Sequence, residues 1–177
     1  TWSIPEAKAT LDFLGVNYYG RRFIRFQRRP GQWLGSECDV AHHPRRVPER
    51  TAMGWDASPT GFTTTLLRAA RLGLPILVTE NGAWMEDDAR RWEFIRGHLE
   101  ALATAIQRGA QVIGYLYWSL LDNFEWARGF APRFGLIEVD YTTQTRRIRD
   151  SGRRLANVCR TNRLTQADAD RSDPASG

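Results

Sequence analysis

Three short segments combine carboxylate, amide and aromatic side chains that could bind a sugar. They are Asn17-Tyr18-Tyr19, Glu80-Asn81-Gly82, and the stretch from Trp118 to Trp126, which contains Glu125. A carboxylate can act as a nucleophile or accept hydrogen bonds from hydroxyl groups. Aromatic side chains supply apolar surface for a bound ring, and a few polar groups fix its orientation.

Each of these residues has a simpler explanation when it is taken alone. Trp118 and Tyr115 suit an apolar core, and Glu125 suits a solvated loop. Asn81-Gly82 is a turn signal whatever the function, and Asp122 suits a brace within its loop. A functional site therefore requires elements that bring the three segments together.

Apolar runs rich in β-forming residues provide such elements. We expect buried strands at residues 11–19, 75–79 and 111–118, and helices at 61–72, 89–108 and 151–161. Continuous apolar strands that alternate with helices indicate a parallel α/β sheet with helices on both faces. In such sheets the reactive groups lie just past the carboxyl ends of the strands, where all three segments fall.

The remaining stretches carry weaker signals. Residues 21–59 are rich in Arg, Pro and Gly, which predicts a long loop. Residues 135–141 and 146–149 predict a hairpin, and the polar stretch at 165–177 is expected to be a disordered tail. No linker divides the rest, so we expect residues 1–164 to form one domain.

Four sequence segments, in order along the chain, resemble glycoside hydrolase family 1, the β-glucosidase family. They are LDFLGVNYY at 11–19, LVTENG at 77–82, YWSLLDNFEW at 117–126 and GFAPRFGLIEVDY at 129–141. The resemblance implies a (β/α)₈ TIM barrel, with the three predicted strands as the family's sixth to eighth. A complete barrel typically needs about 250 residues. We therefore expect 177 residues to form only the C-terminal part of one.

The resemblance also implies a role for each residue that matches a family motif. Glu80 matches the nucleophile that forms a covalent glycosyl-enzyme during hydrolysis of terminal β-linked sugars with retention, and Tyr19 matches the residue that orients it. The matches to substrate-binding residues are Asn17 beside the nucleophile, Trp55 at the aglycone, Trp118 as the sugar platform, Glu125 and Trp126 at the hydroxyl groups, and Phe134 as a wall.

The second carboxyl group of such a site is missing from the sequence. Retaining glycosidases use two carboxyl groups about 5–5.5 Å apart. The family's acid/base glutamate lies in an Asn-Glu-Pro motif, and this sequence contains none. We expect a β-glycosidase whose site is completed by an N-terminal barrel part. The alternative is a catalytically silent half-barrel that binds sugar or a complementary barrel fragment, or that self-associates through an exposed strand edge near 13–19.

Composition argues against several other classes. The 25 basic residues exceed the 20 acidic ones, but they are scattered without a groove-reading motif, so no nucleic-acid partner is expected. The longest apolar runs are far shorter than the about 20 residues that cross a bilayer, so no membrane contact is expected. Two cysteines make no disulfide framework, which fits a cytoplasmic protein. Cys38, His42 and His43 lack a fourth ligand, so we expect no metal, and side-chain chemistry needs no organic cofactor.

Overall fold

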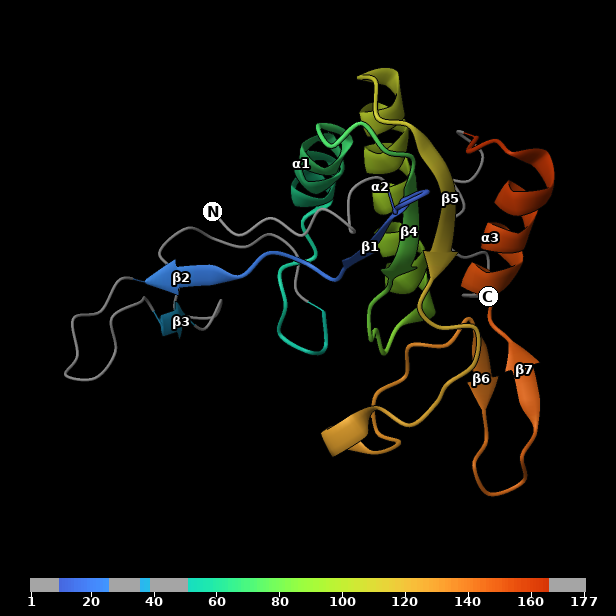
Figure 1. The fold of residues 1–177 in the computed structure, drawn as a ribbon. Helices are drawn as coiled ribbons and strands as arrows, with labels where there is room; N and C mark the ends of the chain where they lie inside the picture. The colour runs from blue at the N-terminus through green and yellow to red at the C-terminus, as the bar shows by residue number, and fades with distance from the viewer. Residues whose placement is uncertain (1–9, 26–35, 39–50, 166–177) are drawn as a thin grey trace.

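The three predicted parallel strands form the central sheet of the computed structural model, which describes residues 10–25, 36–38 and 51–165 (Figure 1). The strands are β1 (Leu14–Tyr18), β4 (Ile76–Asn81) and β5 (Val112–Tyr117), in the order β1-β4-β5. Both neighbouring pairs are parallel. The carboxyl ends of all three strands therefore meet at one edge, with β4 in the middle.

Two helices cover one face of this sheet, α1 (Pro59–Ala70) and α2 (Asp88–Gln107) (Figure 1). Both begin at residues suited to a helix start. The Ser58 side chain accepts a hydrogen bond from the amide of Gly61, and Asp87 accepts one from the amide of Ala89. These caps place both helices slightly earlier in the sequence than the apolar periodicity predicts. A third helix, α3 (Asp150–Thr161), packs against α2.

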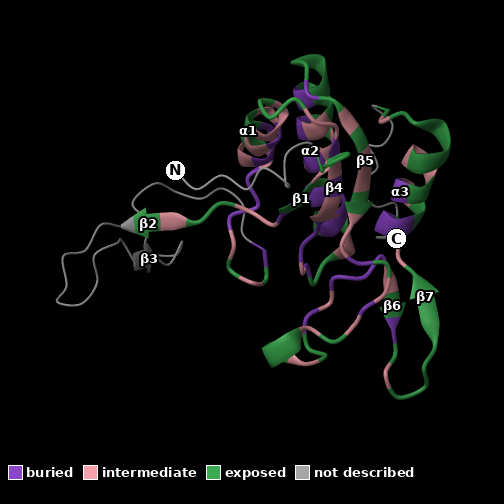
Figure 2. Cartoon of the chain, viewed as in Figure 1, coloured by how far each residue is buried: buried purple, intermediate pink, exposed green. Residues whose placement is uncertain are grey.

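The main core lies between the sheet and these helices (Figure 2). Its buried members are Val16 and Tyr18 from β1, Ile76 and Val78 from β4, Phe62 and Leu66 from α1, Ala101 and Ala105 from α2, and Ala110 just before β5. Burying each large apolar side chain stabilises the fold by about 1.5–3 kcal/mol.

The opposite face of the sheet is open in the described part of the chain. Gly15 and Asn17 of β1 are exposed, and on β5 Ile113 and Leu116 are 60% and 53% exposed. The expectation that helices cover both faces is therefore wrong for these residues. A strand reads as a continuous apolar run both when helices cover its two faces and when one face lines a barrel interior. The barrel interior is apolar because side chains of the other strands fill it.

The predicted loop at residues 21–59 contains more structure than its composition suggests. Strands β2 (Phe23–Arg25) and β3 (Ser36–Cys38) pair antiparallel within it. Strands of this length are too short to leave a periodic pattern, so the sequence could not reveal them. The predicted hairpin is present as β6 (Ile137–Val139) and β7 (Arg146–Ile148). His42, His43 and residues 166–177 of the tail expected at 165–177 lie outside the described residues.

His98 lies at the centre of α2 and is completely buried. Its Nδ1 is 2.8 Å from the carbonyl oxygen of Phe94, and its Nε2 is 2.9 Å from that of Ala57. The imidazole also stacks on the Phe94 ring, with centroids 4.0 Å apart. Burial lowers the pKa of His98 to about 4 and outweighs the two hydrogen bonds, which raise it. The ring is therefore neutral near pH 7.

We expect this histidine to make stability depend on pH. Between pH 6.5, where His98 titrates in the unfolded chain, and about 4, the unfolded chain binds a proton that the folded chain excludes. The free energy of unfolding therefore falls as the pH is lowered, by about 2 kcal/mol between pH 7 and pH 5 from this residue. Urea unfolding at both pH values measures the loss. His98→Gln cannot titrate, and an equal pH dependence in this variant would contradict the prediction.

Candidate active site

Tyr19 and Glu80 form the closest contact among the predicted site residues. The Tyr19 hydroxyl donates a hydrogen bond to Oε2 of Glu80 at 2.6 Å. Tyr19 follows β1 directly, and Glu80 is the penultimate residue of β4, in register with Asn17. Parallel pairing with this register is what brings the two side chains to one edge of the sheet.

The environment of Tyr19 keeps its hydroxyl protonated. Burial raises the pKa of Tyr19 most, followed by the hydrogen bond to Glu80 and the negative charges of Glu80 and Glu125. The phenol is therefore a fixed donor and the Glu80 carboxylate its acceptor.

Two further aromatic rings surround Tyr19. The Trp55 ring meets it edge-on at a centroid distance of 5.7 Å, and the Phe134 ring at 6.4 Å. Trp55 comes from the segment before α1, and Phe134 from the loop that follows β5. A cavity beside them is lined by Asn17, Tyr19 and Trp55, among others. The side-chain oxygen of Asn17 accepts a hydrogen bond from the Thr79 hydroxyl at 2.6 Å.

Asn81 links all three strands beside Glu80. Its side-chain nitrogen donates to the Tyr18 carbonyl at 2.7 Å, and its side-chain oxygen accepts from the Tyr115 hydroxyl at 2.8 Å. Its own carbonyl accepts from the amide of Trp118. The expected turn at Asn81 is wrong, because this residue is the buried last position of β4. An amide serves here because it offers a donor and an acceptor to opposite neighbours.

Gly82 lies against the backbone of Trp118. A Cβ atom at Gly82 would lie 1.8 Å from the Trp118 carbonyl oxygen. The peptide bond that follows Trp118 is cis. The chain can leave β4 past the Trp118 backbone only because residue 82 has no side chain.

The structure does not gather all the predicted residues equally. Glu125 is half-buried and begins the short 3₁₀ turn at Trp126–Arg128. Trp126 is 81% exposed, and no aromatic contact joins its ring to the other predicted residues in the described part of the chain. Direct contacts thus join Tyr19 to Glu80, Trp55 and Phe134, while Trp118 is placed through its backbone.

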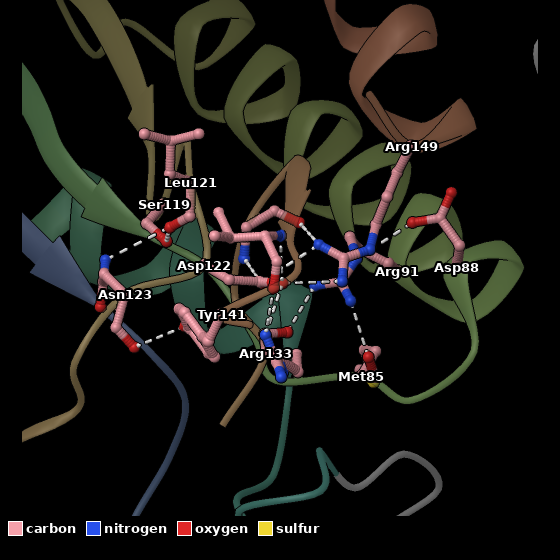
Figure 3. A network of polar contacts seen from close by, with 12 residues as sticks. Met85, Asp88, Arg91, Ser119, Leu121, Asp122, Asn123, Arg133, Tyr141 and Arg149 are labelled. Atoms are coloured by element: carbon pink, nitrogen blue, oxygen red, sulfur yellow. Dashed lines mark hydrogen bonds and ion pairs between the residues drawn. The ribbon is translucent and has the colours of Figure 1, made fainter. Parts of the chain in front are cut away.

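The loop that carries Glu125 and Phe134 is braced by Asp122, as its sequence position predicted (Figure 3). The buried carboxylate of Asp122 accepts hydrogen bonds from the amides of Gly135 and Val139 and forms an ion pair with Arg149 at 2.9 Å. Burial alone would raise the pKa of Asp122, but the Arg149 and Gly135 hydrogen bonds hold it below its usual value. The brace is therefore charged over the physiological pH range.

Two other kinds of site are absent from residues 10–25, 36–38 and 51–165. No group of three or more His, Cys, Asp or Glu side chains there is arranged to hold a metal ion. Among the same residues, no helix has both the length and the apolar character needed to cross a membrane.

Residues 3–164 match the sequence model of glycosyl hydrolase family 1. The chain belongs to this family. It is 39% identical over 173 residues to a 1,4-beta-D-glucan glucohydrolase of Thermotoga neapolitana, and 36% identical over 172 residues to beta-glucosidase A of Thermotoga maritima. The first alignment covers 92% of this chain and the second 91%, but each covers 37% of the relative.

Solved glycosidase structures also match most of this chain but little more than a third of their own length. A beta-glycosidase from Pyrococcus horikoshii superposes with a TM-score of 0.82 at 40% identity, covering 90% of this chain and 37% of that one. The Thermotoga maritima beta-glucosidase in complex with glucoimidazole gives 0.78 at 36% identity, covering 88% and 36%. The predicted family is confirmed. The described residues form a partial α/β portion of the family's TIM barrel and do not themselves close a barrel.

Gly82 provides a direct test of how the site is assembled. Gly82→Ala places a methyl group against the Trp118 carbonyl, and we expect it to lower the free energy of unfolding by about 1–3 kcal/mol. The matched control is Gly97→Ala within α2, where the nearest atom would be an ordinary 3.4 Å away. Helix propensity predicts that this control is neutral or stabilising by up to about 1 kcal/mol. Urea unfolding of both variants measures their free energies of unfolding. Equal values for the two variants would refute the close approach of Gly82 to the Trp118 backbone.

Proposed function

We propose that this chain supplies the nucleophile side of a retaining β-glycosidase site, with Glu80 as the nucleophile. The observation that carries the proposal is the 2.6 Å hydrogen bond from the Tyr19 hydroxyl to Glu80. This bond leaves one carboxylate oxygen oriented by the phenol and the other available for attack. A nucleophile held in this way needs little reorganisation before it reacts.

The proposed reaction proceeds in two displacements. A carboxylate oxygen of Glu80 attacks the anomeric carbon, the bond from that carbon to the aglycone oxygen breaks, and a covalent glycosyl ester forms. The aglycone oxygen takes a proton from the acid/base group of the complementary barrel part, or leaves as an anion where it is a very good leaving group. Water then gives a proton back to the acid/base group and attacks the same carbon, the ester bond breaks, and the Glu80 carboxylate is regenerated. Tyr19 holds the carboxylate in both steps and, as a neutral donor, stabilises its negative charge when the ester breaks.

The surrounding residues provide the sugar site in this proposal. Trp118 forms the platform under the sugar, Glu125 and Trp126 bind its outer hydroxyl groups, and Asn17 binds beside the nucleophile. Phe134 forms a wall of the pocket, and Trp55 flanks the aglycone. Support comes from the contacts of Tyr19 with the Trp55 and Phe134 rings and from the influence of Glu125 on Tyr19.

The acid/base group is proposed to come from a complementary N-terminal barrel part, with β1, β4 and β5 as the sixth to eighth barrel strands. The chain covers 37% of each of the two Thermotoga relatives and contains no Asn-Glu-Pro. Relatives of the chain are named as beta-glucosidases and beta-galactosidases. Terminal β-linked glucosides or galactosides, or short oligosaccharides of them, are accordingly the proposed substrates.

A second candidate is a catalytically silent half-barrel that binds sugar or a complementary fragment. The open face of the sheet favours it, because Ile113 and Leu116 of β5 are more than half exposed there. An apolar sheet face of this kind suits burial against other barrel strands. Both candidates place a sugar at the same residues, and they differ in whether Glu80 reacts.

A mechanism-based probe distinguishes the two candidates. We expect the 177-residue chain to become labelled at Glu80 by a dinitrophenyl β-glucoside in which fluorine replaces the hydroxyl next to the anomeric carbon. The dinitrophenolate leaves without acid assistance, so the missing acid/base group is not required, and fluorine slows hydrolysis of the ester. Intact mass and peptide mass spectrometry locate the sugar.

Two glutamine variants complete this experiment. Glu80→Gln should abolish labelling, whereas Glu86→Gln, at an exposed carboxylate beyond the end of β4, should leave the labelling rate within about twofold of the parent chain. Absence of label at Glu80 in the folded parent chain would refute the catalytic proposal and favour the silent half-barrel.

A further inference from the structure

Arg91 is a fully buried arginine that no sequence motif singled out. It lies in the first turn of α2, and its side chain is 1% exposed. Its Nη2 donates to the Met85 carbonyl at 2.7 Å, while its Nη1 donates to the Arg133 carbonyl at 2.9 Å and lies 3.4 Å from the Ala83 carbonyl. The guanidinium is thus occupied by backbone carbonyl groups of two separate segments, one just before α2 and one 42 residues further along the chain.

Both segments adjoin the candidate active site. Ala83 and Met85 lie in the stretch that leaves β4 immediately after Glu80, Asn81 and Gly82. Arg133 directly precedes Phe134, whose ring packs against Tyr19. A single side chain therefore joins the segment that follows the nucleophile to the segment that forms a wall of the pocket.

The network in Figure 3 fixes both sides of this connection. Nε of Arg91 pairs with Asp88 at 3.1 Å, and Asp88 in turn accepts hydrogen bonds from the amide and hydroxyl of Ser151 at the start of α3. On the other side, the Arg133 side chain donates to the Val139 carbonyl and pairs with Asp122. Arg91 consequently joins the start of α2 to the braced loop, and Asp88 joins the same turn of α2 to the start of α3.

We propose that Arg91 is a positioning residue for the glycosidase site, which sets the placement of Phe134 and the Glu125 loop relative to Glu80. The inference rests on the proposed function. Arginine suits this position because its planar fork presents several donors in fixed directions, whereas a lysine ammonium presents three rotatable donors from one nitrogen. A misplacement of about 1 Å can cost a factor of about 100 in rate.

The test compares Arg91→Lys with Arg96→Lys in the 177-residue chain. Arg96 lies on the same helix, but it is partly exposed and pairs only with Glu100 in the described contacts. Far-UV circular dichroism first confirms that each variant is folded. We expect Arg91→Lys to lower the rate of Glu80 labelling by at least about tenfold and Arg96→Lys to stay within about twofold. Hydrogen–deuterium exchange should accelerate at residues 82–87 and 129–135 in Arg91→Lys only, with β4 and β5 still protected.

Each outcome bears on the proposal separately from the proposed function. Parental labelling and exchange rates in folded Arg91→Lys would overturn the proposal. If the parent chain is not labelled, the catalytic function fails, and the exchange data alone judge whether Arg91 joins the two segments. Arg91→Met, which leaves no unpaired charge buried at position 91, is used if the lysine variant does not fold. Failure of both variants to fold would make Arg91 a requirement of the fold and would also overturn the proposal.

Discussion

The side-chain amide of Asn81 makes the interaction on which the rest of the site depends. It hydrogen-bonds the Tyr18 carbonyl on one side and the Tyr115 hydroxyl on the other, so the carboxyl ends of β1, β4 and β5 are held at fixed spacing. Glu80 precedes it and Tyr19 follows its partner, and their 2.6 Å contact is a consequence of this spacing. A buried amide whose donor and acceptor are both used gives the sheet edge a defined geometry.

Buried ionic groups perform the same task for the loops. Parallel strands can place residues only as far as their own ends, but half of the candidate site lies beyond them. Asp122 holds the loop after β5 to the start of α3 through Arg149, and Arg91 holds that loop to the segment after β4. These ions are costly to bury, and their hydrogen bonds to main-chain groups offset that cost while fixing one arrangement.

The open face of the sheet is explained by a chain that is too short to form a whole barrel. One face packs on α1 and α2, and the other carries exposed apolar side chains of β5 together with Asn17. In a closed barrel this second face would line the interior, and the edge with Tyr19 and Glu80 would lie at the catalytic end. The chain covers 37% of each of the two Thermotoga relatives, which agrees with a sheet that forms one sector of such a barrel.

The sequence by itself determined the family, the parallel α/β class, the three main strands and the segments that meet at their carboxyl ends. It could do so because apolar periodicity and short motifs are local properties, and parallel strands bring their ends to one edge. Tertiary structure alone decided that Asn81 is a clamp and not a turn, that one sheet face is open, that β2 and β3 pair, and that Arg91 joins two loops. Each of these depends on partners distant in the sequence: Asn81 on Tyr18 and Tyr115, and Arg91 on Arg133. The sequence does not reveal which carbonyl groups will surround a given side chain after folding.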